Sequence, residues 1–201
     1  MAKTLEQIEK ELNVLMEEVE TLKNKKKVRI GENLKVCDTF EVAGLQWKIL
    51  DVTDKGYHCL AERFEAGMQF DSNSNDWRNS TLRKYLNNEF LEMLAGEIGK
   101  ENIIPFERDL LSLDGQTEYG ACEDKVSLLT VDEYRKYRSL IPNADYWWWL
   151  VTPWSTPCND YETLVTVVSP SGYFCGSYYG DGRGVRPFCI FSPSIFESEE
   201  E

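Results

Sequence analysis

Aromatic and small polar residues, the types that build recognition surfaces, gather near the C-terminal end of the sequence. Four of the six tryptophans lie within residues 147–154 (WWWLVTPW), and residues 155–183 are rich in Tyr, Ser, Gly, Asn and Asp. Rigid rings supply contact area and small polar side chains supply adaptable hydrogen bonds, so this composition favours ligand recognition. The same residue types also form ordinary hairpin turns with tyrosines covering a sheet, and composition leaves both interpretations open.

Residue patterns typical of enzymes are missing from the sequence. There is no nucleophile elbow, no zinc-binding HExxH, no phosphate-binding P-loop and no GxGxxG. The single histidine, His58, lies in an alternating, strand-like run and is interpreted as structural. Paired carboxylates such as Glu123 and Asp124 are sequence neighbours, whereas acid–base catalysis needs a defined separation across a cleft. We therefore expect no catalytic residue and no cofactor.

The cysteines are predicted to be reduced thiols. No two of them are spaced as CxxC, and no signal sequence directs the chain to an oxidising compartment. The six positions are Cys37, Cys59, Cys122, Cys158, Cys175 and Cys189. Cys158 and Cys175 lie in loop-like sequence and are the pair that a disulfide would join first. A thiol-dependent enzyme acting through Cys158, Cys175 or Cys189 stays open as an alternative.

A calcium loop is imitated but not completed. Asp71, Asn73 and Asn75 match the opening of an EF-hand, but Asp76 stands at position six, where glycine is needed. Leu82 stands at position twelve, where a bidentate glutamate belongs, so an EF-hand is excluded. A looser calcium site using Asp71, Asp76 or the Asn159–Asp160 pair stays open, although we expect no metal.

The charge balance limits the partners that the chain can bind. The sequence has 22 basic and 35 acidic residues among 201, a net charge of −13. Nucleic acids and anionic membrane surfaces bind lysine and arginine, so neither is an expected partner. No apolar run is long enough to cross a membrane, and the N-terminus lacks the apolar centre of a signal peptide. We expect synthesis in the cytoplasm.

The first 27 residues differ from the rest and predict a coiled-coil helix. Two sets of apolar residues repeat every seven positions, three residues apart, which is an a/d seam sustained for three heptads. The sets are Leu5, Leu12 and Val19 at a, and Ile8, Leu15 and Leu22 at d. Such a narrow stripe favours a homo-oligomer over a helix packed on its own globular domain. The mixed residue types at a and d leave the number of chains open, with a trimer preferred.

From residue 28 onward the pattern predicts an α+β domain with a mostly antiparallel sheet and two helices. The first helix covers Leu82–Leu94 after a cap at Asn79 or Ser80, and the second begins at Thr130 with Glu133 completing a capping box. Residues 96–123 predict a loop region or a weakly structured insert. The strands expected from alternation are 35–42, 46–52, 57–64, 126–129, 146–151, 163–168, 172–179 and 184–191. The domains are therefore 1–27, a binding domain 28–193, and an acidic tail 194–201.

Four ordered segments resemble a family of uncharacterised bacterial and phage domains. They are NDWRNSTLRKYLNNEF (75–90), DKVSLLTVDEYRKY (124–137), YWWWLVTP (146–153) and GVRPFCIF (184–191). In that family an SxLRxxLN helix, a KVxLLTxxEY segment, WWLRTP and a closing GVRPAL recur in this order. The match spans residues 35–191, with Val151 in place of the usual arginine and Phe188–Cys189 in place of Ala-Leu.

The resemblance implies a C-type-lectin-like fold of the formylglycine-generating-enzyme branch. Some relatives are variable proteins diversified by retroelements, in which the segment between the WW motif and the closing strand contacts the ligand. By position, that segment here runs from Trp154 to Arg183. The copper-binding cysteine pair of the enzymatic branch has no evident counterpart, so its activity is not carried over.

The leading hypothesis is a non-catalytic binding module, displayed in several copies by the N-terminal coil, that recognises a protein or glycan. Linked copies gain avidity without new contacts. A structural component of a virion or another assembly is a further alternative. Trp77, Arg83, Leu86, Trp148 and Arg186 are interpreted as structural, because they lie in the motifs that build the fold. The expected contact residues are Trp154, Tyr161, Tyr173, Tyr178, Tyr179, Asp181 and Arg183.

Overall fold

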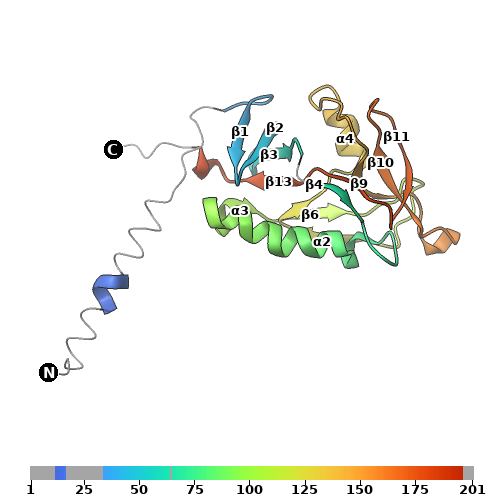
Figure 1. The fold of residues 1–201 in the computed structure, drawn as a ribbon, viewed down its shortest axis with the longest axis horizontal. Coiled ribbons are helices and arrows are strands. Elements are labelled where there is room, and N and C mark those ends of the chain that lie inside the picture. The colour runs from blue at the N-terminus through green and yellow to red at the C-terminus, as the bar shows by residue number, and fades with distance from the viewer. Residues whose placement is uncertain (1–11, 17–33, 64, 197–201) are drawn as a thin grey trace.

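A computed structural model describes residues 12–16, 34–63 and 65–196 (Figure 1). Residues 12–16 are helical, and the predicted seam residues Leu12 and Leu15 are both 56% exposed. The other heptad positions and residues 197–201 of the predicted tail 194–201 lie outside the described residues, so the coiled coil stays a prediction. No helix in the described part is both long and apolar enough to cross a membrane.

The described domain is α+β, with mostly antiparallel sheets and few helices, as the sequence predicts. The first sheet has the strand order β1-β2-β3-β13-β5, and β8 also pairs with β13. Its strands are β1 (Thr39–Val42), β2 (Leu45–Thr53), β3 (Gly56–Ala61), β5 (Ile103–Ile104), β8 (Val126–Ser127) and β13 (Phe188–Phe191). In β1, Phe40 and Val42 are buried while Thr39 and Glu41 are exposed, which is the alternation expected of a strand with one covered face.

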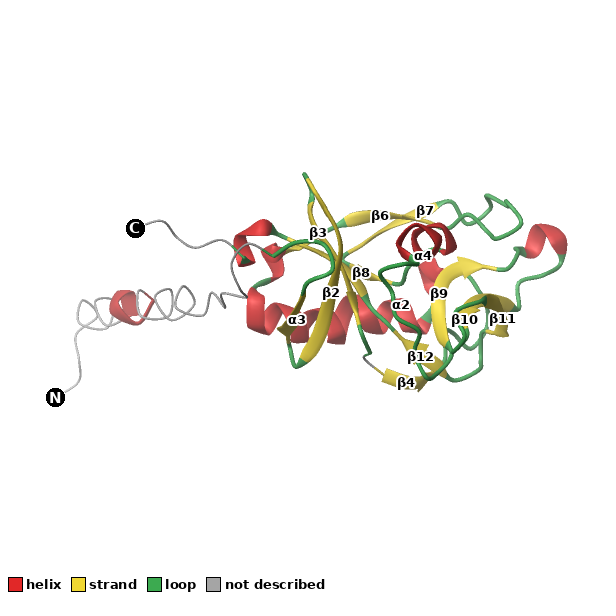
Figure 2. Ribbon diagram, turned by 90° about the horizontal axis from the view of Figure 1, so that it is seen from above, coloured by secondary structure: helices red, strands yellow, loops and turns green. Residues whose placement is uncertain are grey.

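The second sheet lies at the end of the domain away from β1 (Figures 1 and 2). Its strand order is β11-β10-β9-β12-β4, in which β12 and β9 run parallel and the other pairs antiparallel. Its strands are β4 (Glu65–Met68), β9 (Trp148–Pro153), β10 (Leu164–Val168), β11 (Phe174–Tyr178) and β12 (Arg183–Val185).

One long helical segment runs beneath the strands (Figure 1). It consists of α2 (Thr81–Tyr85), a wide π turn (Leu86–Phe90) and α3 (Leu91–Ile98). Of the two predicted caps, Ser80 is the one used, since its side chain accepts a hydrogen bond from Arg83 N. Gly99, with φ of 83°, ends the segment four residues later than predicted.

The second helix, α4 (Val131–Tyr137), begins with the predicted capping box. Thr130 Oγ1 accepts from Glu133 N at 3.0 Å, and Glu133 Oε2 accepts from Thr130 N at 2.8 Å. Short 3₁₀ turns at Trp77–Asn79, Lys100–Asn102, Pro157–Asn159 and Pro193–Ile195 complete the described helices.

Two cores lie on opposite faces of the sheets. Trp149 belongs to the core between the sheets and the α2–α3 segment, whereas Trp148 belongs to the core under α4. Trp147 is only half-buried and packs against the first core. Trp147 and Trp149 therefore lie on one face and Trp148 on the other, as the alternation of a strand requires.

The segment 184–191, predicted to be one strand, is two strands in different sheets. β12 ends at Val185 in the second sheet, and β13 begins at Phe188 in the first. Pro187 separates them because it cannot donate a ladder hydrogen bond. Arg186 is buried at this crossing, where its Nε donates to Ala61 O at 3.1 Å and its guanidinium lies 5.0 Å from the Trp148 ring centroid.

The segment 96–123 is more ordered than predicted. It contains β5 and most of an antiparallel hairpin of β6 (Phe106–Asp109) and β7 (Ala121–Asp124). The inward position of β6 is Arg108, only 2% exposed, which pairs with Glu133 of α4 at 2.5 Å. Because a buried arginine stands where an apolar residue is expected, this strand lacks the hydrophobic alternation by which strands are predicted.

The residues interpreted as structural make structural contacts. Trp77 Nε1 and Arg83 Nε donate to the two carboxylate oxygens of buried Asp124, at 2.7 and 2.6 Å. Leu86 is fully buried in the first core. These contacts join the start of the helical segment to β7 and hold the hairpin against the helix.

Candidate functional site

Two loops from distant parts of the sequence meet at Asp114. One loop connects β6 to β7, and the other, residues 154–161, follows β9. Asp114 Oδ2 accepts from Ser155 Oγ at 2.7 Å and from Asn159 Nδ2 at 2.9 Å, and Oδ1 accepts from Ser112 Oγ. These hydrogen bonds, that of Ser112 most strongly, hold the pKa of Asp114 below its ordinary value. The carboxylate is therefore ionised at neutral pH and ties the two loops together.

A surface hollow of about 230 Å³ lies where these loops meet. Trp154 and Tyr161 line it together with the polar residues Asp114, Ser155 and Asn159. Tyr161 is 43% exposed, and Trp154 is partly buried. In the described part of the chain, no other ring and no cation stacks on either of these two rings.

The missing side chain of Gly176 leaves room for Trp154. A Cβ added at Gly176 of β11 would lie 3.1 Å from Trp154 Cε3 and 2.9 Å from Leu164 Cδ1. Both distances are shorter than ordinary carbon contacts. The indole therefore lies directly on the backbone of β11, which fixes the wall of the hollow that it forms.

One residue of the second loop adopts the left-handed backbone conformation. Asp160, with φ of 52° and ψ of 36°, follows the turn Pro157–Asn159 and carries Tyr161 to the hollow. Aspartate tolerates this conformation better than most residues, but it still costs a non-glycine residue about 1 kcal/mol. The loop bears this cost, and the two residues on either side of Asp160 both line the hollow. These residues are Asn159 and Tyr161.

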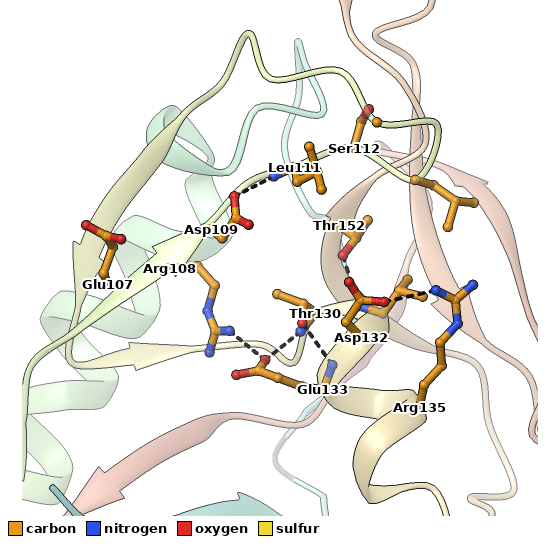
Figure 3. Close-up of a pocket in the computed structure, with 13 residues that line it drawn as sticks. Glu107, Arg108, Asp109, Leu111, Ser112, Thr130, Asp132, Glu133, Arg135 and Thr152 are labelled. Atoms are coloured by element: carbon orange, nitrogen blue, oxygen red, sulfur yellow. Dashed lines mark hydrogen bonds and ion pairs between the residues drawn. The ribbon is translucent and has the colours of Figure 1, made fainter.

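A larger cavity of about 320 Å³ lies on the other side of the same turn, between β6 and the start of α4 (Figure 3). Ser112, Leu113 and Gly115 line this cavity, whereas the intervening Asp114 lines the hollow. The two arginines of the cavity are paired within the chain, Arg108 with Glu133 at 2.5 Å and Arg135 with Asp132 at 2.9 Å (Figure 3).

Arg108 lines this cavity and is held by contacts with residues of other strands. Its Nε donates to Ser127 Oγ at 3.1 Å, and its guanidinium lies 4.8 Å and 5.3 Å from the ring centroids of Phe106 and Phe188. Nη2 has no hydrogen-bond partner among the described residues. None of the predicted contact residues lines this cavity.

Three of the predicted contact residues lie on the face of β11 opposite the Trp154 ring. Successive residues of a strand point to opposite faces, so Ser177 faces away from the side on which Trp154 covers Gly176. Ser177 Oγ accepts from Arg183 Nε at 2.9 Å and donates to Asp181 Oδ2 at 2.8 Å. Arg183 Nη2 also lies 3.0 Å from Asp181 Oδ2, so these polar groups bind each other.

The third residue of this group is Tyr173, which is 56% exposed. Its ring meets Trp147 edge-on, with centroids 5.7 Å apart, and the Arg183 guanidinium lies 6.0 Å from the Trp147 centroid. We call Trp147, Tyr173, Ser177, Asp181 and Arg183 the paired patch, because each of its side chains already has a partner within the chain.

The adjacent tyrosines Tyr178 and Tyr179 stack on each other. Their ring centroids are 4.3 Å apart, with a 33° angle between the planes. Tyr178 is 46% exposed, but Tyr179 is half-buried and packs against the first core. The structure therefore brings Trp154 and Tyr161 together in one hollow and places the other predicted contact residues outside its lining.

Sequence reasoning named neither Asp114 nor Ser155 as a contact residue, and it considered Asn159 only as a calcium ligand. Ser155 and Asn159 lie in the loop after β9, in the polar segment whose composition left recognition and ordinary turns both open. Asp114 lies in the segment 96–123, from which no candidate was drawn. The signal that could have found it is the dipeptide Asp114–Gly115, which marks a turn between strands. A backbone hydrogen bond from Gly115 N to Ser112 O at 3.0 Å closes that turn.

The thiols are all free, as predicted. Burial raises the pKa values of Cys59 and Cys189 well above the usual thiol range. Cys158 is exposed, but a hydrogen bond to the Glu118 side chain raises its pKa as well. A raised pKa lowers the thiolate fraction at neutral pH, and the thiolate is the nucleophile. Both environments therefore disfavour the thiolate at Cys158 and Cys189.

The carboxylates considered for calcium have protein partners. Asp71 accepts hydrogen bonds from the backbone of Asn73, Ser74 and Thr81, and Asp76 forms an ion pair with Arg78 at 2.8 Å. In the part of the chain that the structure describes, no three acidic, histidine or cysteine side chains are grouped as metal ligands would be. His58 lies 3.1 Å from Thr53 Oγ1 and packs edge-on against Phe188, and burial lowers its pKa.

Comparison with known proteins identifies a family. Residues 57–193 match the family described as "Domain of unknown function (DUF6273)". The match covers more than half of the chain, and the chain therefore belongs to this family. The matched range includes both loops that form the hollow. No curated protein and no solved structure matches the chain.

Proposed function

We propose that this family member is a non-catalytic ligand-binding module, which recognises a protein or glycan through its C-terminal aromatic surface. The observation that carries the proposal is the hollow itself. Trp154 and Tyr161 face it without a stacking partner among the described residues, beside an Asp114 carboxylate fixed by three hydrogen bonds. A concave site with open rings and a few fixed polar groups is the usual form of a ligand site.

The rigidity of the hollow supports binding. Trp154 rests on the backbone of β11, and Asp114 links the two loops before any ligand arrives. Side chains that are already fixed lose little conformational entropy when a ligand binds, which favours affinity. Neither feature requires a reactive group, and the raised pKa values of Cys158 and Cys189 favour a binding role over a thiol-dependent enzyme.

The proposal includes the overall design expected from the sequence. The binding domain would have a C-type-lectin-like fold, and residues 1–27 would form a coiled coil that displays several copies, a trimer being favoured. By the same resemblance, the loop residues 154–161 would correspond to part of the segment that varies in retroelement-diversified proteins. A chain that lacks residues 1–27 should run as a monomer in sizing chromatography with light scattering, whereas the full chain should run as an oligomer. Equal masses would contradict the display part of the proposal.

The binding function is tested with two probes, a glycan microarray and a library of random peptides displayed on phage. The full chain should bind members of at least one probe saturably. Tyr161→Ala should weaken that binding by about tenfold or more, because truncation of a central tyrosine typically removes over 1 kcal/mol. The matched control is Tyr173→Ala, another exposed tyrosine that lies outside the hollow. Absence of saturable binding to both probes, or equal effects of the two variants, would reject the proposal.

A further inference from the structure

We infer that the hollow binds an uncharged saccharide ring. The inference rests on the proposed binding function and narrows it, because it names the ligand chemistry of the same five lining residues. Three properties of the hollow support this inference. They are the open ring faces, the unpaired polar atoms of its lining residues, and the charge of its lining.

The open ring faces fit one side of a sugar. Trp154 and Tyr161 lack stacking partners in the described part of the chain, whereas Tyr173 and Tyr178 each have one. A pyranose presents a face of C–H groups that packs against an aromatic ring, because the ring carries negative charge on its face. Two aromatic walls in one hollow thus provide the apolar contact that a hydroxylated ring can use.

Polar atoms of the lining residues that lack a partner fit hydroxyl groups. Trp154 Nε1, Tyr161 Oη and Asn159 Oδ1 form no hydrogen bond among the described residues. The first is a donor, the last an acceptor, and the tyrosine hydroxyl is both. Sugar hydroxyls likewise donate and accept, so one ring can bind donors and acceptors together. The Asn159 amide cannot turn over without losing its bonds to Asp114 and Ser155, which fixes its oxygen as the free atom.

The charge of the lining excludes acidic sugars. Neither lysine nor arginine is among the residues that line the hollow, and Asp114 is ionised there. The chain as a whole carries −13, which adds to the repulsion of sulfate, phosphate or carboxylate groups. A cationic ligand is the competing class. It fits less well, because three neutral donors already bind the Asp114 carboxylate and solvate its charge.

The experiment probes the full chain with a glycan microarray that carries neutral, sialylated and sulfated oligosaccharides, and titrates the best neutral one by calorimetry. We expect binding to neutral members only. Trp154→Ala and Tyr161→Ala should each weaken it about tenfold or more, and Tyr173→Ala less than about twofold. Because Trp154 is partly buried, the exposed Tyr161 provides the variant that leaves the fold intact.

The dependence of affinity on salt, and on the charge of residue 114, distinguishes a neutral saccharide from a cationic ligand. Affinity for a neutral saccharide should change less than about twofold between 50 and 500 mM salt, because no opposite charges are screened. A cationic ligand would lose affinity as salt is added, and Asp114→Asn should weaken its binding and reduce that salt dependence. Binding of peptides but of no neutral saccharide, with Tyr161→Ala still disruptive, would overturn the saccharide inference and leave the binding function standing. Loss of both kinds of binding would overturn both.

Discussion

The hollow and the paired patch have similar residue types but different free surfaces. Both contain a tryptophan, a tyrosine and an aspartate. In the hollow, Asp114 binds only neutral donors and the rings have no stacking partner within the described residues. In the paired patch, Asp181 binds Arg183, and Tyr173 and Arg183 both contact Trp147. The difference shows that residue type alone does not report which side chains lack a partner within the chain.

The physical origin of the difference is one residue of β11. Gly176 lets Trp154 lie on the strand from one side, while its neighbour Ser177 binds Arg183 and Asp181 on the other. A side chain held by a strand backbone keeps its outer face available, whereas one held by another ring or ion pair does not. Three pairs of substitutions test this comparison.

The largest expected effect is on stability at the stacked tyrosines. Tyr179→Ala should lower the free energy of unfolding by about 2–3 kcal/mol, because its ring packs against the first core. Tyr178→Ala, which removes an exposed ring, should cost less than about 1 kcal/mol. Urea unfolding followed by far-UV circular dichroism measures both. Similar values for the two variants would mean that Tyr179 is a surface residue like its neighbour.

A matched pair of glycine substitutions tests the role of the backbone at each ring. Gly176→Ala places a Cβ 3.1 Å from Trp154, and Gly180→Ala places one 2.7 Å from Tyr178 Cε1. Both rings must move, but only the first lines the hollow. We expect Gly176→Ala to weaken ligand binding about threefold to tenfold. Gly180→Ala should leave it unchanged, and calorimetry with the same ligand compares them. Equal losses would indicate that both rings contact the ligand.

The smallest expected effect is a dependence on pH. The pKa of Asp114 lies below its ordinary value of 3.8, so its hydrogen bonds stabilise the folded loops above about pH 4. This contribution is lost as the pH falls through the lowered pKa. Because the group is exposed, we expect less than about 1 kcal/mol. Urea unfolding at pH 7 and pH 3 should show a smaller acid loss in Asp114→Asn than in the wild type. Glu107→Gln, at an exposed strand position, is the control, and no difference between these variants would contradict the role of Asp114.

Local sequence signals predicted the elements well where apolar periodicity was clear. The α4 capping box and the cap at Ser80 are both as expected. The prediction was wrong at 184–191, where Pro187 breaks the ladder between two sheets, and incomplete at 96–123, where buried Arg108 stands in for an apolar residue. In both cases a partner distant in sequence decides the structure.

The sequence by itself determined the class of fold, the candidate helix caps and the composition of the C-terminal surface, because these depend on short-range periodicity and residue type. Tertiary structure alone decided that Asp114 accepts hydrogen bonds from Ser155 and Asn159, which both lie more than forty positions further along the chain. It also decided that Trp154 and Tyr161 share one hollow while Arg183 pairs with Asp181 on the other face of β11. Hydrogen bonds and ring contacts of this kind depend on distances in space, and residues far apart in the chain carry no local pattern that reports them.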